Sequence, residues 1–432
     1  MRELGIWMDG QRIGTLDGTD SRNLQISYAE SWASNPSSTP LSVSMPLASP
    51  VHSGKTVHAY LWGLLPDNEQ VITRWAKSFQ CSPQDIFGLL QGVGADVAGA
   101  ARYQRIDAGL SSEPIEPDGF EQLDENGVAE LLRSLTNDST AWHARIRSHW
   151  SLAGAQSKFA LCFDDITESW SIPTGRNPTT HIFKPAIAGL RFHDLNEHLC
   201  LTAAARLGLP TAISNIARFG SERALVVTRY DRMRVAGIVE RIHQEDFCQA
   251  LGVPPEKKYQ ADGGPSLEDL VTLLREVEIK SADDDVNTLV RAAAFNWLIL
   301  GTDAHAKNYS LLLSGRQVRL ARLYDLASAA PYGEHPKKLR MSQKIGRDYR
   351  PTEISSLHWE RLALSARIDS GQLIRDITTM ATRLPEVLNE ILAPLARSVL
   401  TDDEIKAAEH IVESIRSWAT SRLTKLGSAT TE

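Results

Sequence analysis

The sequence predicts an α+β protein with two lobes and a small α+β module added at the N-terminus. Short β-prone runs fill residues 150–230, whereas the pattern from about residue 243 onward is mostly helical. Strands followed by helices are typical of an α+β body. The acidic residues 106–120, rich in Pro, Gly and Ser, indicate a linker. We therefore expect a module at 1–105, a linker at 106–120, a β-rich lobe at 121–242 and an all-helical lobe at 243–432.

The composition is that of a globular protein. Of the 432 residues, 42% are apolar and 23% are charged, which excludes a largely disordered chain. The net charge of -7 argues against binding nucleic acid by overall charge alone. The four cysteines are scattered, which fits a reducing compartment. We find neither a signal-peptide core nor the roughly 18 apolar residues of a membrane span, so we expect a cytoplasmic protein without membrane contact.

The N-terminal module begins with a hairpin. Strand-like runs at 4–8 and 12–16 flank Asp9-Gly10, a pair that favours a type I′ turn. Residues 41–45 alternate apolar and polar side chains, which predicts a half-buried strand. Helical patterns follow at 57–64, 68–91 and 124–137.

The body contains further periodic runs. Leu195, Leu199, Ala203 and Leu207 are spaced four apart, which predicts a helix over 194–207 with one apolar face. The other expected elements are strands at 159–163, 181–184 and 224–230, and helices at 243–251, 266–276, 285–300 and in several segments from 354 to 424.

The segment GTDAHAKNYSLLL, residues 301–313, is the most informative for chemistry. Asp303 and Asn308 stand five residues apart, as the aspartate and asparagine of the protein-kinase catalytic loop do. Phosphoryl transfer needs a carboxylate to orient the hydroxyl and oxygen ligands for Mg²⁺, and Lys307 would add a cation. Taken alone, the spacing fits a polar loop at the end of a helix equally well.

Two further residues extend this pattern. Asp325 lies 22 residues beyond Asp303, after an alternating apolar run, where a second Mg²⁺ carboxylate would be needed. Leu326 follows it, in place of the Phe-Gly of most protein kinases; the alternative is a turn or helix-cap carboxylate. Lys184 ends a β-prone run and could reach ATP phosphates, with Glu197 as its ion-pair partner. The alternative is a lysine of an edge strand whose charged end lies in water.

The segment SLAGAQSKFAL, residues 151–161, offers a phosphate loop. Its small residues would let backbone N–H groups approach phosphate oxygens, with Lys158 adding charge. The alternative is a tight turn before a strand.

In this order, the segments resemble the HipA family of bacterial serine/threonine protein kinases, toxins of type II toxin–antitoxin systems. The resemblance covers residues from about 4 to 345 and implies a two-lobed protein-kinase-like fold with an added N-terminal module. The matching strings include GIWMDGQRIGTL, SLAGAQSKFAL, THIFKPA, NEHLCLTAAARLGLP, VVTRYDR, NWLILGTDAHAKNYSLLL and LYDLASAAP.

The resemblance implies a function with two partners. The protein would use ATP and Mg²⁺ to phosphorylate an aminoacyl-tRNA synthetase (glutamyl-tRNA synthetase or a related one), inhibiting translation and promoting growth arrest and persistence. A HipB-type DNA-binding antitoxin would neutralise it, and the pair would repress their operon, with operator DNA contacted mainly through the antitoxin.

The resemblance also implies residue roles. Asp303 corresponds to the catalytic aspartate, Asn308 and Asp325 to Mg²⁺ ligands, and Lys184 to the ATP lysine. Ser151 corresponds to an autophosphorylated serine whose modification inactivates. Ser157 stands where some relatives carry Glu, and could offer a second hydroxyl. Further nucleotide contacts are implied for Ala153, Gly154, Ala155, Gln156, Ser157, Lys158, Glu240, Arg241, Ile242, His305, Lys307 and Asn308.

Two alternatives stay open: a corepressor without catalysis, and a small-molecule or lipid kinase of the same fold. A basic cluster is either a solvated surface or a docking patch for a tRNA-loaded synthetase or operator DNA. Its members are Lys337, Lys338, Arg340, Lys344, Arg347 and Arg350.

Overall fold

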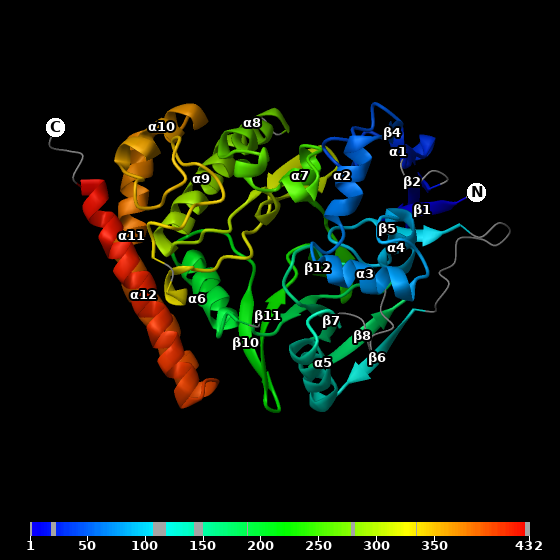
Figure 1. Ribbon diagram of the computed structural model, residues 1–432. Helices are drawn as coiled ribbons and strands as arrows, with labels where there is room; N and C mark the ends of the chain where they lie inside the picture. The colour runs from blue at the N-terminus through cyan, green and yellow to red at the C-terminus, as the bar shows by residue number, and fades with distance from the viewer. Residues whose placement is uncertain are drawn as a thin grey trace. The chain divides into compact units, whose positions relative to one another are not determined.

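The computed structural model describes residues 2–18, 23–106, 118–141, 150–187, 189–277, 281–333 and 335–427 (Figure 1). Most of the expected linker, residues 107–117, lies outside this part. The chain divides into two compact units, and its helices and antiparallel sheets confirm the α+β class. The first unit comprises Met1–Pro185, Arg218–Glu256 and Leu311–Val318; the second comprises Ala186–Ala217, Lys257–Ser310 and Arg319–Glu432.

The first unit opens with a five-stranded sheet in the order β4-β3-β2-β1-β5. Asp9 and Gly10, with φ of 50° and 75°, form the expected hairpin turn between β1 and β2. The elements are β1 (Glu3–Met8), β2 (Gln11–Asp17), β3 (Gln25–Tyr28), α1 (Glu30–Ala33), β4 (Val51–Ser53), α2 (Lys55–Gly63), α3 (Glu69–Ser78), α4 (Ile86–Val93) and β5 (Arg102–Arg105).

Two expectations for this region are wrong. Residues 41–45 form a turn instead of a strand, because the amide of Met45 donates to the carbonyl oxygen of Ser42 and the Tyr28 hydroxyl donates to that of Met45. The expected helix over 68–91 is two helices, α3 and α4. The chain breaks between them, where Gln80 takes a φ of 54° and Pro83 follows.

A second sheet runs β10-β11-β9-β7-β8-β6, and the expected strands at 159–163, 181–184 and 224–230 are present. Phe159 of β7 pairs with Phe183 of β9, and their rings stack 4.8 Å apart. The elements are β6 (Gly119–Leu123), α5 (Glu125–Asn137), β7 (Phe159–Asp164), β8 (Ser169–Thr174), β9 (His181–Lys184), β10 (Ser214–Phe219), β11 (Glu222–Thr228) and the separate hairpin β12 (Arg232–Val235) with β13 (Ile238–Arg241).

The range 243–432 is mostly helical, but the expectation of an all-helical lobe is wrong, because the range also contains a three-stranded sheet, β14-β15-β16. The expected helix over 243–251 begins only after Asp246, whose side chain caps α7 and so separates it from β14. The strands are β14 (His243–Asp246), β15 (Ser310–Ser314) and β16 (Gln317–Leu320), and the short helix α7 spans Phe247–Ala250.

Long helices build the second unit. The buried helix α9 carries Phe295 and Trp297, both fully covered, and α11 packs along α12 (Figure 1). No helix in the described ranges is long and apolar enough to cross a membrane. The α-helices are α6 (His193–Arg206), α8 (Leu267–Val277), α9 (Ala282–Ile299), α10 (Ser356–Ala366), α11 (Ser370–Ser398) and α12 (Asp402–Gly427).

Candidate functional site

The predicted catalytic segment begins where α9 ends. Leu300 closes the helix with a φ of 57°, and the amide of Gly301 donates to the carbonyl oxygen of Asn296 over 2.6 Å. A Cβ on Gly301 would meet the Asn296 side chain at 2.6 Å, so the close turn requires glycine. The last eight residues of α9, 292–299, are all buried and therefore give the following residues a rigid support.

The structure brings Asp303 and Asn308 together. The side-chain amide of Asn308 donates to the backbone carbonyl of Asp303 over 2.8 Å, and the amide of His305 donates to the same oxygen over 2.8 Å. The carboxylate of Asp303 is exposed, and its Oδ1 accepts a 2.7 Å hydrogen bond from the hydroxyl of Tyr259. The backbone and the side chain of Asp303 are thus held by different partners.

Asp325 lies in a strained turn. Its φ of 57° is uncommon for a non-glycine residue, and its side chain is exposed while Leu326 is buried. The preceding Tyr324 donates its hydroxyl to the carbonyl oxygen of Lys307 over 2.7 Å. Asp325 is therefore connected to the 303–308 segment through its neighbour, and no helix begins at it.

The residues present fit a magnesium ion. Because the nitrogen of the Asn308 side chain is bonded to Asp303, its oxygen is left to bind a metal, and Asp325 adds an exposed carboxylate. Mg²⁺ is commonly held by one or two such ligands together with phosphates and water. Throughout the described ranges, no group of three or more His, Cys, Asp or Glu could hold a metal.

His305 and Lys307, both implied to contact nucleotide, are buried at 4% and 5% exposure. The ring of His305 meets that of Tyr259 edge-on, with centroids 4.9 Å apart. Tyr259, which the sequence did not single out, thus touches two residues of the segment. The Lys-Tyr-Gln context shows no signal for this contact, since it arises only when the two loops meet.

The phosphate-loop candidate, residues 151–158, lies in the first unit. Gly154 takes a φ of 103°, and the Lys158 ammonium closes the loop by donating to the carbonyl oxygen of Ala153 over 2.7 Å. Ala155 is exposed, Gln156 donates weakly to the carbonyl oxygen of Pro185, and Ser157 donates to that of Ser139. The loop is compact, and nucleotide contact by it stays a prediction.

Ser151 is completely buried. Its hydroxyl donates to the carbonyl oxygen of Leu64 over 2.7 Å, and its amide donates to that of Asp96 over 2.9 Å. A phosphate group brings about two negative charges and three acceptor oxygens, which this position cannot hold. Modification of Ser151 would therefore require the loop to leave this position.

The remaining predicted contacts are spread over both units. Lys184 lies buried in β9, and Glu197 lies buried in α6 of the second unit, so their pairing stays a prediction. Glu240 and Arg241 end β13, and the amide of Ile242 already donates to the carbonyl oxygen of Asp231 over 2.9 Å. An adenine at this stretch would have to use other backbone groups than that amide.

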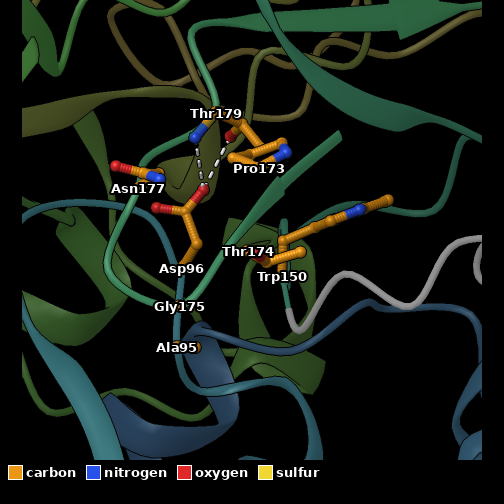
Figure 2. Close-up of a pocket in the computed structure, with 8 residues that line it drawn as sticks. All are labelled: Ala95, Asp96, Trp150, Pro173, Thr174, Gly175, Asn177 and Thr179. Atoms are coloured by element: carbon orange, nitrogen blue, oxygen red, sulfur yellow. Dashed lines mark hydrogen bonds between the residues drawn. The ribbon is translucent and has the colours of Figure 1, made fainter. Parts of the chain in front are cut away.

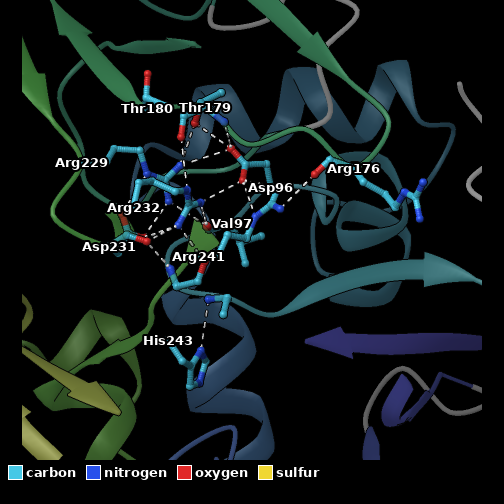
Figure 3. Close-up of polar contacts among 12 residues, drawn as sticks. Asp96, Val97, Arg176, Thr179, Thr180, Arg229, Asp231, Arg232, Arg241 and His243 are labelled. Atoms are coloured by element: carbon cyan, nitrogen blue, oxygen red, sulfur yellow. Dashed lines mark hydrogen bonds and ion pairs between the residues drawn. The ribbon is translucent and has the colours of Figure 1, made fainter. Parts of the chain in front are cut away.

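A buried ionic cluster surrounds Asp96, which no motif in the sequence singled out (Figure 3). One carboxylate oxygen accepts from Arg232 over 2.8 Å and from Arg241 over 3.0 Å; the other accepts from Arg229 over 3.3 Å and from the hydroxyl of Thr179 over 2.7 Å. Burial alone would raise the pKa of Asp96, but the three arginines hold it far below its ordinary value. No spacing in the sequence indicates this cluster.

A small pocket opens beside Asp96 and Thr179 (Figure 2). Its volume of about 20 Å³ has room for roughly one water molecule, far less than a nucleotide needs. This pocket is therefore part of the polar cluster and no candidate for a nucleotide site. It is lined by Ala95, Asp96, Trp150, Pro173, Thr174, Gly175, Asn177 and Thr179.

Comparison with known proteins identifies the family. The HipA-like C-terminal domain matches residues 150–392, and the HipA N-terminal domain matches residues 4–104. Y4mE of Sinorhizobium fredii, named as a candidate kinase, is 37% identical over 91% of this chain and 92% of its own. The serine/threonine-protein kinase toxin HipA of Shewanella oneidensis is 27% identical over 89% of this chain and 87% of its own.

A solved structure agrees with these relatives. HipA in the complex of Shewanella oneidensis HipA, HipB and operator DNA superimposes with a TM-score of 0.81 and 25% identity, covering 98% of this chain and 97% of that one. The two family domains together account for most of the chain. The chain therefore belongs to the HipA family and has its protein-kinase-like fold.

Proposed function

We propose that this protein is a serine/threonine protein kinase that uses ATP and Mg²⁺. The observation that carries the proposal is the arrangement of Asp303 and Asn308: an exposed carboxylate whose backbone is held by the asparagine. Asp303 orients the acceptor hydroxyl and takes its proton, while the hydroxyl oxygen bonds to the γ-phosphorus of ATP and the bond from that phosphorus to ADP breaks, releasing ADP. Lys184 and Lys307 bind phosphate oxygens, as do the backbone amides of the loop at 153–158.

The candidate metal ligands are Asn308 and Asp325. Magnesium bound there supplies positive charge that neutralises the phosphate oxygens. The strained turn keeps the carboxylate of Asp325 exposed while Leu326 is buried, and the bond to Asp303 orients the amide of Asn308. Both ligands are therefore positioned by the chain's own contacts.

The family resemblance suggests the substrate, and a solved relative suggests the partner. We infer that the protein phosphorylates an aminoacyl-tRNA synthetase, glutamyl-tRNA synthetase or a related one, in the bacterial cytoplasm, and so inhibits translation and promotes persistence. A HipB-type antitoxin neutralises it, as suggested by the relative solved with HipB and operator DNA. The net charge of -7 supports contact with operator DNA mainly through that antitoxin.

Autophosphorylation of Ser151 inactivates the kinase in this proposal. Because the serine is buried against Leu64, its phosphate forces the loop at 153–158 out of place. Ser151→Asp should therefore lose ATP binding, measured by calorimetry, whereas Ser157→Asp should retain more of it. ATP binding by Ser151→Asp equal to that of the parent protein would contradict this role.

The decisive experiment maps phosphorylated sites. The protein is incubated with ATP, Mg²⁺ and a cell lysate, and new phosphoserines and phosphothreonines are identified by mass spectrometry. Asp303→Asn should lose about 10²–10⁴-fold of the rate, the usual contribution of a general base. If the parent protein phosphorylates no protein above the level of Asp303→Asn, the kinase proposal fails and a corepressor without catalysis is favoured. If phosphate is transferred only to small molecules, a small-molecule or lipid kinase is favoured.

A further inference from the structure

Residues 335–350 of the second unit, here called the basic segment, carry six cations and one acid in a chain of net charge -7. Five of the cations are exposed and Lys344 is half-buried. Within the described ranges, none of the six forms an ion pair. The cations are Lys337, Lys338, Arg340, Lys344, Arg347 and Arg350, and the acid is Asp348. Unmatched charge repels itself and leaves the surface ready for an anionic partner.

The basic segment is fastened next to the predicted catalytic aspartate. Ser342 donates its hydroxyl to the carbonyl oxygen of Thr302 over 2.6 Å, and Thr302 directly precedes Asp303. The backbone amide of Lys344 donates to the side chain of Gln260 over 2.6 Å. Gln260 follows Tyr259, which binds the Asp303 carboxylate. Two separate hydrogen bonds thus hold Ser342 and Lys344 of the basic segment beside residues that adjoin, in the chain, Asp303 or its hydrogen-bond partner.

The backbone of the segment keeps a strained arginine. Arg347 has a φ of 101°, a conformation that glycine adopts freely and other residues only at a cost. The preceding Gly346 is confined as well, because a Cβ there would meet the carbonyl oxygen of His358 at 2.3 Å. Residues held in such conformations cluster at sites that bind ligands or partners.

The aromatic residue of the segment is already engaged. The guanidinium of Arg340 lies 4.6 Å from the ring centre of Tyr349, and the ammonium of Lys344 lies 5.2 Å from it. Single-stranded nucleic acids are held largely by stacking bases on such rings. Because two cations lie over this ring, the segment is better suited to carboxylates than to bases.

We propose that the basic segment binds an acidic stretch of the protein substrate, beside the hydroxyl that is phosphorylated. This inference rests on the proposed kinase function. It assigns a substrate class, a serine or threonine near several Asp or Glu residues, and assigns Lys337, Lys338 and Arg347 to its recognition.

Binding of a fluorescent peptide tests the proposal without catalysis. The peptide carries one serine among six glutamates, and its twin carries glutamines instead. We expect the full-length protein to bind the acidic peptide, and Lys337→Gln/Lys338→Gln/Arg347→Gln to bind it about tenfold more weakly, since exposed pairs contribute modestly each. The matched control, Arg383→Gln/Arg397→Gln/Lys406→Gln, removes three exposed cations from α11 and α12 and should bind like the parent protein.

The outcomes separate this inference from the proposed function. Equal loss in both triple variants, equal binding of the glutamine peptide, or preference for duplex DNA or oligo-dT over the acidic peptide would overturn the inference. Segment-dependent binding without phosphorylation on adding ATP and Mg²⁺ would overturn the kinase function alone. Equal phosphorylation of the acidic peptide by the parent protein and by the variant without the three segment cations would overturn the inference and leave the kinase function standing.

A single substitution gives an independent check. Because glycine adopts a φ of 101° freely, Arg347→Gly should unfold at or above the temperature of the parent protein. It should nevertheless bind the acidic peptide about threefold more weakly, as expected for one exposed charge. A stable Arg347→Gly with unchanged binding would show that this arginine takes no part in recognition.

Discussion

Asp96 and Asp303 are both aspartates held by hydrogen bonds, but their surroundings differ in kind. Asp96 is 5% exposed, and both of its oxygens accept from arginines of the same unit. Asp303 is exposed, and its Oδ1 accepts from the neutral hydroxyl of Tyr259. A carboxylate surrounded by arginines is committed to structure, whereas an exposed one held by a neutral donor can meet a substrate.

The position of Asp96 explains what its cluster does. Asp96 belongs to the range matched by the HipA N-terminal domain, while Arg229, Arg232 and Arg241 belong to the C-terminal match. The cluster therefore joins the N-terminal module to the β-rich part within one compact unit. The backbone carbonyl oxygen of Asp96 also accepts a hydrogen bond from the amide of Ser151. This bond links the N-terminal module to the phosphate-loop candidate.

Removing the charge of the buried Asp96 should change the free energy of unfolding more than any other substitution considered below. Asp96→Asn removes the carboxylate that pairs with Arg241 and leaves Arg232 with Asp231 alone, and removing one partner of a buried pair costs about 3–5 kcal/mol. The free energy of unfolding, measured with denaturant, should fall by that amount. The matched control is Asp138→Asn, which breaks an exposed pair with Arg74 and should cost less than about 1 kcal/mol. Equal losses would mean that the cluster is unimportant for stability.

A second buried carboxyl group, that of Glu245, differs from Asp96 because no arginine lies beside it in the described part of the chain. Glu245 is 1% exposed, and burial raises its pKa from 4.5 to about 8, although the amide of Val43 donates to it over 2.7 Å. Between these pH values the folded state keeps the proton that the unfolded state has lost. Stability should therefore decrease as the pH rises from 4.5 to 8, by a few kcal/mol, and level off above.

Glu245→Gln should remove this slope, because glutamine does not titrate. The measurement is the free energy of unfolding at a series of pH values. Glu121→Gln, at an exposed position of β6, serves as the control and should keep the slope of the parent protein. A slope that survives in Glu245→Gln would assign the pH dependence to another group.

The smallest expected effect concerns the exposed aspartate. Tyr259→Phe removes the hydroxyl that holds Asp303 but keeps the ring against His305. We expect kcat to fall about tenfold with KM for ATP unchanged, because a hydrogen bond to a charged group contributes about 1.5–3 kcal/mol and solvent replaces part of it. In an Asp303→Asn background the same change should have no further effect.

Tyr332→Phe is the matched control for this prediction, since the hydroxyl of Tyr332 accepts from the side chain of Asn196 over 3.2 Å within the same unit. It should leave kcat unchanged. A loss of activity in Tyr259→Phe that persists in the Asp303→Asn background would show that the tyrosine acts through some other group.

The elements and contacts that could be predicted from the sequence are those that depend on residues close together in the chain. The hairpin at Asp9-Gly10 and the helix over 194–207 depend on neighbouring residues, and both are present. Asp303 and Asn308 lie within one short turn, so their contact follows from a separation of five residues. Where the outcome depended on a distant residue, as at 41–45 beside Tyr28, the expectation was wrong.

The sequence by itself determined the fold class, the family resemblance and the segment at 301–313, because these are written in patterns and strings that lie close together in the chain. Only the tertiary structure decided which charges are matched. Within the described ranges, Asp96 meets arginines more than 130 residues away, Glu245 meets none, and the six cations at positions 337–350 form no ion pair. The physical reason is that the energy of a charge depends on its burial and its partners, and folding brings both from far along the chain.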